Sequence, residues 1–302
     1  MEIVAIINYK GGVGKTTVTA NLGAELAFRG NSVLLLDLDP QASLTFSFVR
    51  PDYWQQHLAD ASTIKSWFDS FHEGNPVDLN DLVLAPSEAN DRIDRGVLHL
   101  IPSHLGLINV DLELATELTG GSLQQSKRKY LRVHRRLAEG VAKLNTDYDY
   151  LLIDCPPNFN VVTKTAIVAA GHILIPAKPD YLSTLGIDYL QRSLNQLIED
   201  FNDYAKLETP HPVPIDPQVL GVIFTMVSMY GKQPISTMRP FISQTERLGL
   251  PVFETMVREN KSLFGDAPQY GVPVVLTRQN QGTYAQIVTE LEHLTTEFEN
   301  RI

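Results

Sequence analysis

A glycine-rich segment follows directly after the first apolar run of the chain. Residues 3–7 are apolar and mostly β-branched, and residues 8–17 read NYKGGVGKTT before a stretch rich in alanine and leucine. This order is typical of a strand, a phosphate-binding loop and a helix. The glycines allow a tight turn that points backbone N–H groups into one concavity, and the helix N-terminus adds positive potential there. The segment therefore predicts a site for the phosphates of a nucleotide.

The loop departs from the general phosphate-loop pattern at Tyr9, where that pattern has a glycine. Instead, Lys10 precedes Gly11 and Gly12, so the loop contains two lysines, Lys10 and Lys15. This form resembles the deviant Walker A motif of the ParA/MinD family of ATPases, in which the early lysine is the signature residue. Together with the motifs described below, the resemblance covers almost the whole chain.

Two further apolar runs end in acidic residues. Residues 33–36 lead to Asp37 and Asp39, and residues 150–153 lead to Asp154 in the sequence DCPP. Such runs are typical of parallel strands buried on both faces, and open α/β sheets bind ligands at the carboxyl ends of their strands. The acids at 37 and 39 could also be solvated loop residues. The Asp-x-Pro-Pro ending resembles the Walker B element of the same family, and an acid beside a phosphate loop can hold Mg²⁺ through water.

The resemblance implies a role for each residue of these motifs. Lys15 would hold the β- and γ-phosphates of ATP, and Thr16 would ligate Mg²⁺. Asp39 would position the attacking water, with Asp37 and Asp154 as acids of the metal site. The remaining phosphate contacts would come from Gly11, Gly12, Val13, Gly14 and Thr17. Segments that could contact adenine include Thr225, Met226 and residues 257–260.

Lys10 would reach the nucleotide of a second subunit, so that ATP joins a homodimer. Phosphoryl transfer depends mainly on positioning and charge stabilisation, so a lysine supplied by a partner can couple turnover to dimerisation. The resemblance implies a ParA-type partitioning ATPase with ATP and Mg²⁺ as cofactors. It would bind DNA non-specifically and hydrolyse ATP slowly until a ParB-like partner stimulates it. It would be cytoplasmic, and nucleoid-associated when ATP is bound. The cargo stays open between a plasmid, a chromosome and a protein assembly.

Basic residues that could contact DNA occur in two places, although a formal net charge of −10 argues against coating of nucleic acid by bulk charge. One place is the predicted helix 122–144, whose basic cluster between Lys127 and Arg136 we interpret first as a solvated helix face. The other is the C-terminal region, where the family places its DNA contacts. The candidates there are Lys232, Arg239, Arg258 and Lys261.

Three alternatives use the same scaffold differently. A MinD-like membrane organiser needs a basic amphipathic C-terminal helix, but residues 287–302 are acidic, so we expect no stable association with anionic lipid. A metabolic enzyme related to the nitrogenase iron protein needs several cysteines, and Cys155 is the only one. We interpret Cys155 as a buried, inert thiol in a reducing cytosol. The third alternative is a scaffold that binds ATP without hydrolysing it.

The alternation of strands and helices predicts an α/β fold with a single doubly wound, mostly parallel sheet flanked by helices. One ParA-like ATPase domain would span residues 1–302, with a less typical, insertion-like segment at 46–95 whose aromatic residues we attribute to local packing. Residues 235–248 are predicted to be helical despite Pro240, and residues 252–253 to form a short strand.

Overall fold

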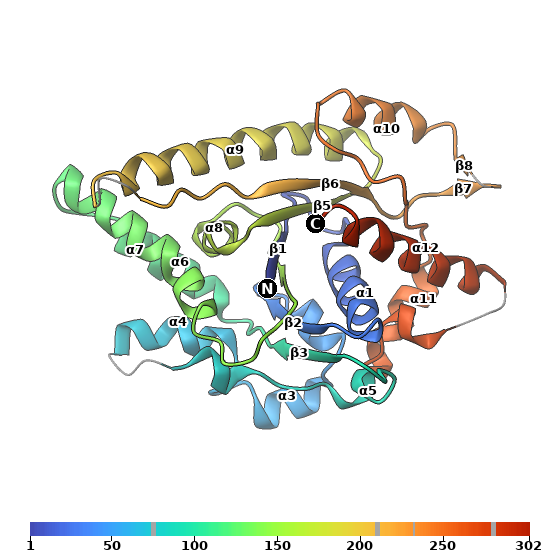
Figure 1. The fold of residues 1–302 in the computed structure, drawn as a ribbon, viewed down its shortest axis with the longest axis horizontal. Coiled ribbons are helices and arrows are strands. Elements are labelled where there is room, and N and C mark those ends of the chain that lie inside the picture. The colour runs from blue at the N-terminus through green and yellow to red at the C-terminus, as the bar shows by residue number, and fades with distance from the viewer. Residues whose placement is uncertain (74–76, 209–211, 232, 279–281) are drawn as a thin grey trace.

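A six-stranded parallel sheet lies at the centre of the structure (Figure 1). The structure is a computed structural model, and it describes residues 1–73, 77–208, 212–231, 233–278 and 282–302. In spatial order, the strands are β3 (Val97–Ile101), β2 (Ser32–Asp37), β4 (Tyr150–Asp154), β1 (Glu2–Ile6), β5 (His172–Ala177) and β6 (Gln218–Phe224). The predicted α/β class with a mostly parallel sheet is confirmed.

Helices cover both faces of this sheet, as expected for a doubly wound fold. The helices on one face are α4 (Ile64–Glu73), α6 (Leu107–Glu117), α7 (Leu123–Val141), α8 (Val161–Ala169), α9 (Tyr181–Ala205) and α10 (Arg239–Glu246). Those on the other face are α1 (Lys15–Phe28), α2 (Ser43–Phe46), α3 (Pro51–His57), α5 (Ser87–Asn90), α11 (Lys261–Asp266) and α12 (Gly282–Glu299). The short elements are the 3₁₀ turns η1 (Leu79–Leu82), η2 (Ala267–Tyr270) and η3 (Val274–Thr277), and a hairpin of β7 (Met229–Tyr230) and β8 (Gln233–Pro234).

Alternate residues of each strand enter two different cores. In β1, Ala5 packs into the core under α6 to α9, whereas Val4 and Ile6 pack with α1 and α12. Because both faces are covered, the side chains on both are mainly apolar, and the strands are nearly continuous apolar runs in the sequence. The C-terminal elements share these cores, since β6 pairs with β5 and α12 packs on α1. One domain over residues 1–302 remains a prediction.

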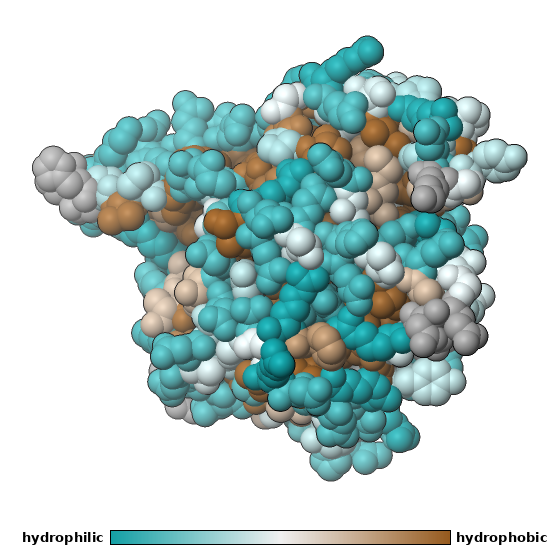
Figure 2. Space-filling view, turned by 45° about the vertical axis from the view of Figure 1, so that its right-hand side comes forward, coloured by the Kyte–Doolittle hydropathy of each residue, from teal (hydrophilic) through white to brown (hydrophobic). Residues whose placement is uncertain are grey.

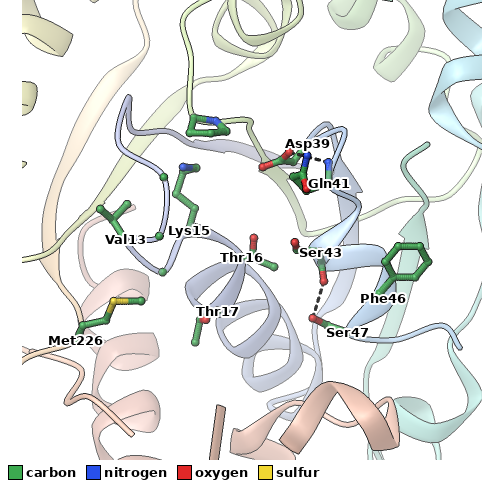
Figure 3. Close-up of a pocket in the computed structure, with 14 residues that line it drawn as sticks. Val13, Lys15, Thr16, Thr17, Asp39, Gln41, Ser43, Phe46, Ser47 and Met226 are labelled. Atoms are coloured by element: carbon green, nitrogen blue, oxygen red, sulfur yellow. Dashed lines mark hydrogen bonds between the residues drawn. The ribbon is translucent and has the colours of Figure 1, made fainter. Parts of the chain in front are cut away.

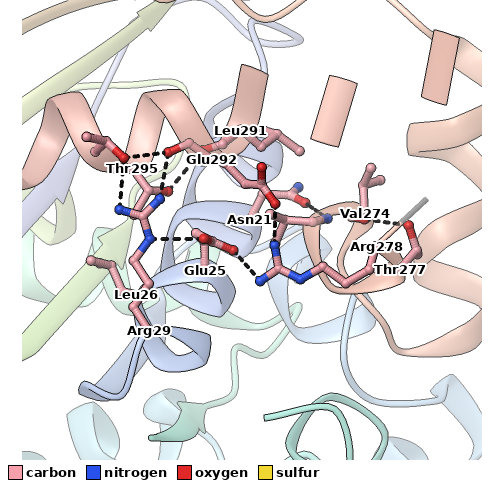
Figure 4. Close-up of polar contacts among 12 residues, drawn as sticks. Asn21, Glu25, Leu26, Arg29, Val274, Thr277, Arg278, Leu291, Glu292 and Thr295 are labelled. Carbon is pink, nitrogen blue, oxygen red and sulfur yellow. Dashed lines mark hydrogen bonds and ion pairs between the residues drawn. The ribbon is translucent and has the colours of Figure 1, made fainter. Parts of the chain in front are cut away.

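A polar network also fixes α12 against α1 (Figure 4). The buried carboxylate of Glu25 on α1 accepts hydrogen bonds from Arg29 and from Arg278, which follows η3. Arg278 also pairs with Glu292 of α12 at 2.5 Å, and its guanidinium lies 3.6 Å from the centre of the Phe28 ring. The helix that begins at the glycine-rich loop is thereby tied to the C-terminal part of the chain.

Segment 46–95 forms short elements beside the β3 edge of the sheet (Figure 1). Its aromatic residues Trp54, Trp67 and Phe68 are buried, and Trp54 Nε1 donates to the carbonyl of Ser103 at 3.1 Å. These three side chains therefore serve packing, as interpreted from the sequence, whereas Tyr53 and Phe71 of the same segment are exposed.

Two local predictions are wrong. The helix predicted over residues 235–248 is shorter, because proline lacks the N–H that a helix interior requires; α10 therefore begins at Arg239, with Pro240 in its first turn. The predicted strand at residues 252–253 is reduced to one bridge between Val252 and Val222.

The surface in Figure 2 is mainly hydrophilic, and hydrophobic residues gather there in small groups. None of the helices in the described part of the chain combines the length and apolarity that a bilayer crossing requires. The C-terminal helix α12 buries its apolar residues Ile287, Leu291, Leu294 and Phe298 in the core shared with α1. The apolar side of α12 is therefore covered by the chain itself.

Candidate functional site

The glycine-rich loop joins the end of β1 to the start of α1, and two of its glycines have left-handed backbone angles. Gly12 has φ 67° and Gly14, which caps α1, has φ 78°. A Cβ on Gly14 would also approach the side chain of Thr225 to 3.3 Å, which is tighter than normal contact. Thr225 holds the loop from that side, since its hydroxyl donates to the carbonyl of Val13 at 2.7 Å. Only glycine fits this position well.

The loop forms one wall of a cleft of about 580 Å³ (Figure 3). The opposite wall comes from the segment after β2, from α2 and from the segment after β4. The residues that line the cleft are Gly11, Gly12, Val13, Gly14, Lys15, Thr16, Thr17, Asp39, Gln41, Ser43, Phe46, Ser47, Pro157 and Met226. The predicted phosphate-binding residues and Asp39 therefore lie together around one cavity.

Lys15 is almost fully buried at the base of this cleft. Within the described part of the chain, its Nζ donates only long hydrogen bonds, to the carbonyls of Asn8 at 3.3 Å and Lys10 at 3.2 Å. Burial lowers the pKa of Lys15, and the nearby carboxylates of Asp154 and Asp39 act in the opposite direction. An ammonium group held this loosely fits a phosphate ligand, which would supply stronger charge-assisted hydrogen bonds.

Asp37 and Asp154 end adjacent parallel strands and are register partners, so their carboxylates are both buried at the same sheet edge. Burial raises the pKa of Asp37 to about 7, while hydrogen bonds from Thr45 partly oppose this. Burial, followed by the charge of Asp37, raises the pKa of Asp154 well above its usual value. Thr16 Oγ1 donates to Asp154 Oδ2 at 2.7 Å. The three predicted metal-site residues thus come together, and a divalent cation would relieve the repulsion between the two acids.

Asp39 lies at the mouth of the cleft, where it can contact solvent and a bound nucleotide. One carboxylate oxygen accepts from the N–H of Gln41 at 2.9 Å, and its main-chain carbonyl accepts from Ser103 Oγ at 2.7 Å. Burial raises the pKa of Asp39 above its usual value, although the hydrogen bond from Gln41 and the charge of Lys15 partly oppose this. These contacts fix the backbone beside the cleft that Asp39 lines. Cys155, the residue after Asp154, is buried as predicted.

The side chain of Lys10 is paired within its own chain. Its Nζ lies 2.7 and 2.8 Å from the two carboxylate oxygens of Asp180, at the start of α9, and 3.3 Å from Ser183 Oγ. The sequence contains no pattern that predicts this pair, because its members are 170 residues apart.

A second, smaller cleft of about 210 Å³ adjoins the loop on the side of Gly14 and is mainly apolar. Thr225, Met226 and residues 257–260 line it, as the candidate adenine segments require. Sequence reasoning missed Phe264 of α11 and Leu291 of α12, which complete the cleft. Their apolar side chains look like ordinary helix packing in the sequence, so no local signal marks them.

The candidate DNA-binding residues are differently placed. Arg239 and Lys261 are exposed. Arg258 is held by Glu290 of α12, with Nη2 2.6 Å from Oε1, and it lines the second cleft. Lys232 lies outside the described residues. The three candidates that the structure describes therefore do not form one set of equally free cations.

The basic residues of α7 mostly contact neighbouring parts of the chain. Arg136 is buried and pairs with Glu117 of α6, and Arg135 pairs with Glu208. Lys129 donates to the carbonyl of Thr119 at 2.7 Å. These contacts favour the interpretation of this cluster as part of a helix face that packs and is solvated.

Comparisons with known proteins agree with this geometry. A sequence family described as an AAA domain matches residues 1–207. The sporulation initiation inhibitor protein Soj of Bacillus subtilis is 27% identical over 278 residues, which cover 91% of this chain and 90% of that protein. The chromosome partitioning protein ParA of Myxococcus xanthus is 27% identical over 283 residues, which cover 91% of this chain and 81% of that protein.

The fold has a counterpart among solved structures. An ATP complex of a McdA variant from Cyanothece matches with a TM-score of 0.73 and 22% identity, over 99% of this chain and 96% of that one. This likeness shows the shared fold, and the family match and sequence relatives show the lineage. The chain belongs to the ParA/Soj-type partitioning ATPases.

Proposed function

We propose that the protein is a Mg²⁺-dependent ATPase that dimerises with ATP, binds DNA non-specifically and positions a DNA cargo with a ParB-like partner. The observation that carries this proposal is the cleft lined by Lys15, Thr16 and Asp39, with the buried Asp37–Asp154 pair directly behind Thr16. The two acids have pKa values raised by burial, so a divalent cation is the natural counter-charge for them.

Within this proposal, the chain's own residues supply positioning and charge. Lys15 and the loop N–H groups would hold the phosphates, and the apolar cleft beside Gly14 would hold adenine. Thr16 and Asp154 would hold Mg²⁺, which would neutralise charge that develops on the phosphates. Asp39 would orient a water molecule toward the terminal phosphate.

Dimerisation is supported by the surface next to Lys10. The first half of α9 exposes a stripe of large apolar residues, which we call the α9 stripe: Tyr181, Leu182, Leu185 and Tyr189. The stripe adjoins the loop, since the ring centres of Tyr189 and Tyr9 are 5.1 Å apart. A contiguous exposed apolar surface favours contact with another protein surface, and a second copy would bring its nucleotide toward Lys10.

Substitution of Lys10 and Asp39 tests the ATPase and the dimer. We expect Asp39→Ala to retain ATP binding and to lose phosphate release, and Lys10→Ala to retain much of the ATP binding while hydrolysis is lost. ATP-dependent dimerisation is measured by light scattering. If both hydrolysis and dimerisation survive Lys10→Ala, the proposed role of the loop is wrong.

A salt titration tests DNA binding. We expect ATP-dependent binding to non-specific duplex DNA, whose affinity falls steeply as salt rises. The double variant Arg239→Ala/Lys261→Ala should weaken binding for all sequences and lower the salt slope by about 2, because each lost phosphate contact removes about 1. Failure to bind even at low salt with ATP would refute the DNA part of the proposal alone.

A further inference from the structure

All three N–H donors of the Lys10 ammonium group are used in this structure. A lysine Nζ has three protons to donate and no acceptor. The two oxygens of Asp180 and the hydroxyl of Ser183 take one each, at 2.7, 2.8 and 3.3 Å. Lys10 therefore cannot bind a phosphate oxygen of any nucleotide while this arrangement persists.

The surroundings of Asp180 favour its negative charge, which binds the Lys10 ammonium group. Its Oδ1 also accepts from the N–H of Ser183 at 2.9 Å, which makes Asp180 the N-cap of the 25-residue helix α9. The helix N-terminus favours a negative charge at this position. Burial alone would raise the pKa of Asp180, but the hydrogen bonds from Lys10 and Ser183 hold the pKa below its usual value.

The main chain of Lys10 is anchored separately from its side chain. Its N–H donates to Asn8 Oδ1 at 2.9 Å, and Asn8 Nδ2 donates to the carbonyl of Pro176 in β5 at 2.8 Å. The ion pair itself is only half buried, with both side chains 32% exposed. The side chain of Lys10 can thus leave Asp180 without rearrangement of the loop, and water can replace the broken contacts.

We propose that Asp180 is a positioning residue that holds Lys10 within its own subunit until a partner subunit brings a nucleotide. This inference rests on the proposed function, in which Lys10 acts across a dimer. Dimer formation then requires both Lys10–Asp180 pairs to open. A triphosphate carries more negative charge than one carboxylate, so the exchange is favourable once the partner's nucleotide is in reach. Asp180 consequently raises the protein concentration that dimerisation requires.

The variant Asp180→Asn separates this role from helix capping. Asparagine is as good an N-cap as aspartate, so α9 keeps its cap while Lys10 loses its ionic partner. We expect ATP-dependent dimers at about tenfold lower protein concentration, because two pairs open per dimer and each contributes roughly threefold. Asp203→Asn is the matched control, since Asp203 lies near the other end of the same helix, away from the α9 stripe, and pairs with Lys206 instead. The control should dimerise like the wild type.

A second measurement uses the nucleotide-free monomer and does not depend on dimerisation. Acetylation of Lys10 by acetic anhydride, followed by peptide mass spectrometry, should be faster in Asp180→Asn than in the wild type and unchanged in Asp203→Asn. Unchanged or weaker dimerisation of a well-folded Asp180→Asn protein would overturn the proposal. If the wild type never dimerises with ATP, the proposed function fails, and an unchanged acetylation rate would then show that the ion pair is absent as well.

Discussion

Thr16 Oγ1 donates a 2.7 Å hydrogen bond to Oδ2 of Asp154, which joins the first turn of α1 to the end of β4. The two residues are 138 positions apart in the sequence, and each was assigned to the same metal site from its own motif. Their contact joins the two motifs in one site. The Thr16 hydroxyl lies next to the Asp154 carboxylate, so that a bound cation would contact both groups. A substitution at Thr16 should therefore affect binding of the metal more than binding of the nucleotide.

We expect Thr16→Ala to remove most of the gain in ATP affinity that Mg²⁺ provides, a loss of about tenfold or more for one ligand. Affinity measured in EDTA should change little, because the loop N–H groups remain. Thr16→Ser keeps the hydroxyl and is the control. Isothermal titration with and without Mg²⁺ measures both values, and an unchanged Mg²⁺ dependence in Thr16→Ala would contradict the assignment.

The α9 stripe gives a prediction about assembly. Leu185 is 47% exposed, so Leu185→Glu should leave folding and ATP binding intact. A charge in the centre of a subunit contact would weaken ATP-dependent dimerisation by at least about tenfold, because it would be buried without a partner. Val213→Glu adds the same charge at a residue that is 89% exposed and remote in sequence from the stripe. Sedimentation velocity with ATP should find dimers of Val213→Glu and monomers of Leu185→Glu. Dimers of both variants would exclude the α9 stripe from the subunit interface.

Glu25 should matter for stability. Its buried carboxylate pairs with Arg29 and Arg278 (Figure 4). Glu25→Ala leaves both guanidinium groups without this partner, although each keeps a second acid and part of its hydration. We therefore expect a loss of about 2 kcal/mol in the free energy of unfolding, below the full cost for a buried pair. Urea denaturation measures it. Asp188→Ala breaks an exposed pair of the same i,i+4 spacing and should cost under about 0.5 kcal/mol.

The sequence could predict the parts of the site that depend on local order along the chain. Strand, glycine-rich loop and helix are consecutive, and the acids at 37 and 154 follow apolar runs, so their meeting at one sheet edge follows from parallel topology. The Lys10–Asp180 pair and the contribution of Leu291 to the second cleft could not be predicted in this way. Each depends on how closely two elements that are distant in the sequence pack together. The periodicity of a sequence carries no information on that distance.

The same limit explains the outcome for the basic residues. Clusters of lysine and arginine look alike in sequence whether their charges are free or paired. The structure gives Arg258 and Arg136 acidic partners on other helices, whereas Lys261 is 89% exposed, with Glu259 4.0 Å away. Composition could not separate these cases, because the partners Glu290 and Glu117 are distant in sequence or belong to another helix.

His134 gives a prediction about pH. It is fully buried in α7, where its Nδ1 donates to the carbonyl of Tyr130 at 2.7 Å and its Nε2 has no hydrogen-bond partner among the described residues. Burial lowers the pKa of His134 to about 4. In the unfolded chain the histidine pKa is about 6.5. Between pH values of about 6.5 and about 4, His134 is therefore protonated in the unfolded chain and neutral in the folded chain. Stability must therefore fall as the pH falls from about 6.5 to about 4.

At pH 5 this single group should cost about 2 kcal/mol relative to pH 7. Leucine has a volume similar to that of histidine and does not titrate. The decrease in the free energy of unfolding between pH 7 and pH 5 should therefore be smaller in His134→Leu than in the wild type, by about 2 kcal/mol. Urea denaturation at both pH values measures the difference. The exposed His293 supplies the control, because His293→Gln should keep the wild-type pH dependence. Equal slopes in wild type and His134→Leu would mean that His134 is solvated in solution, since its burial is what disfavours the protonated imidazole in this range.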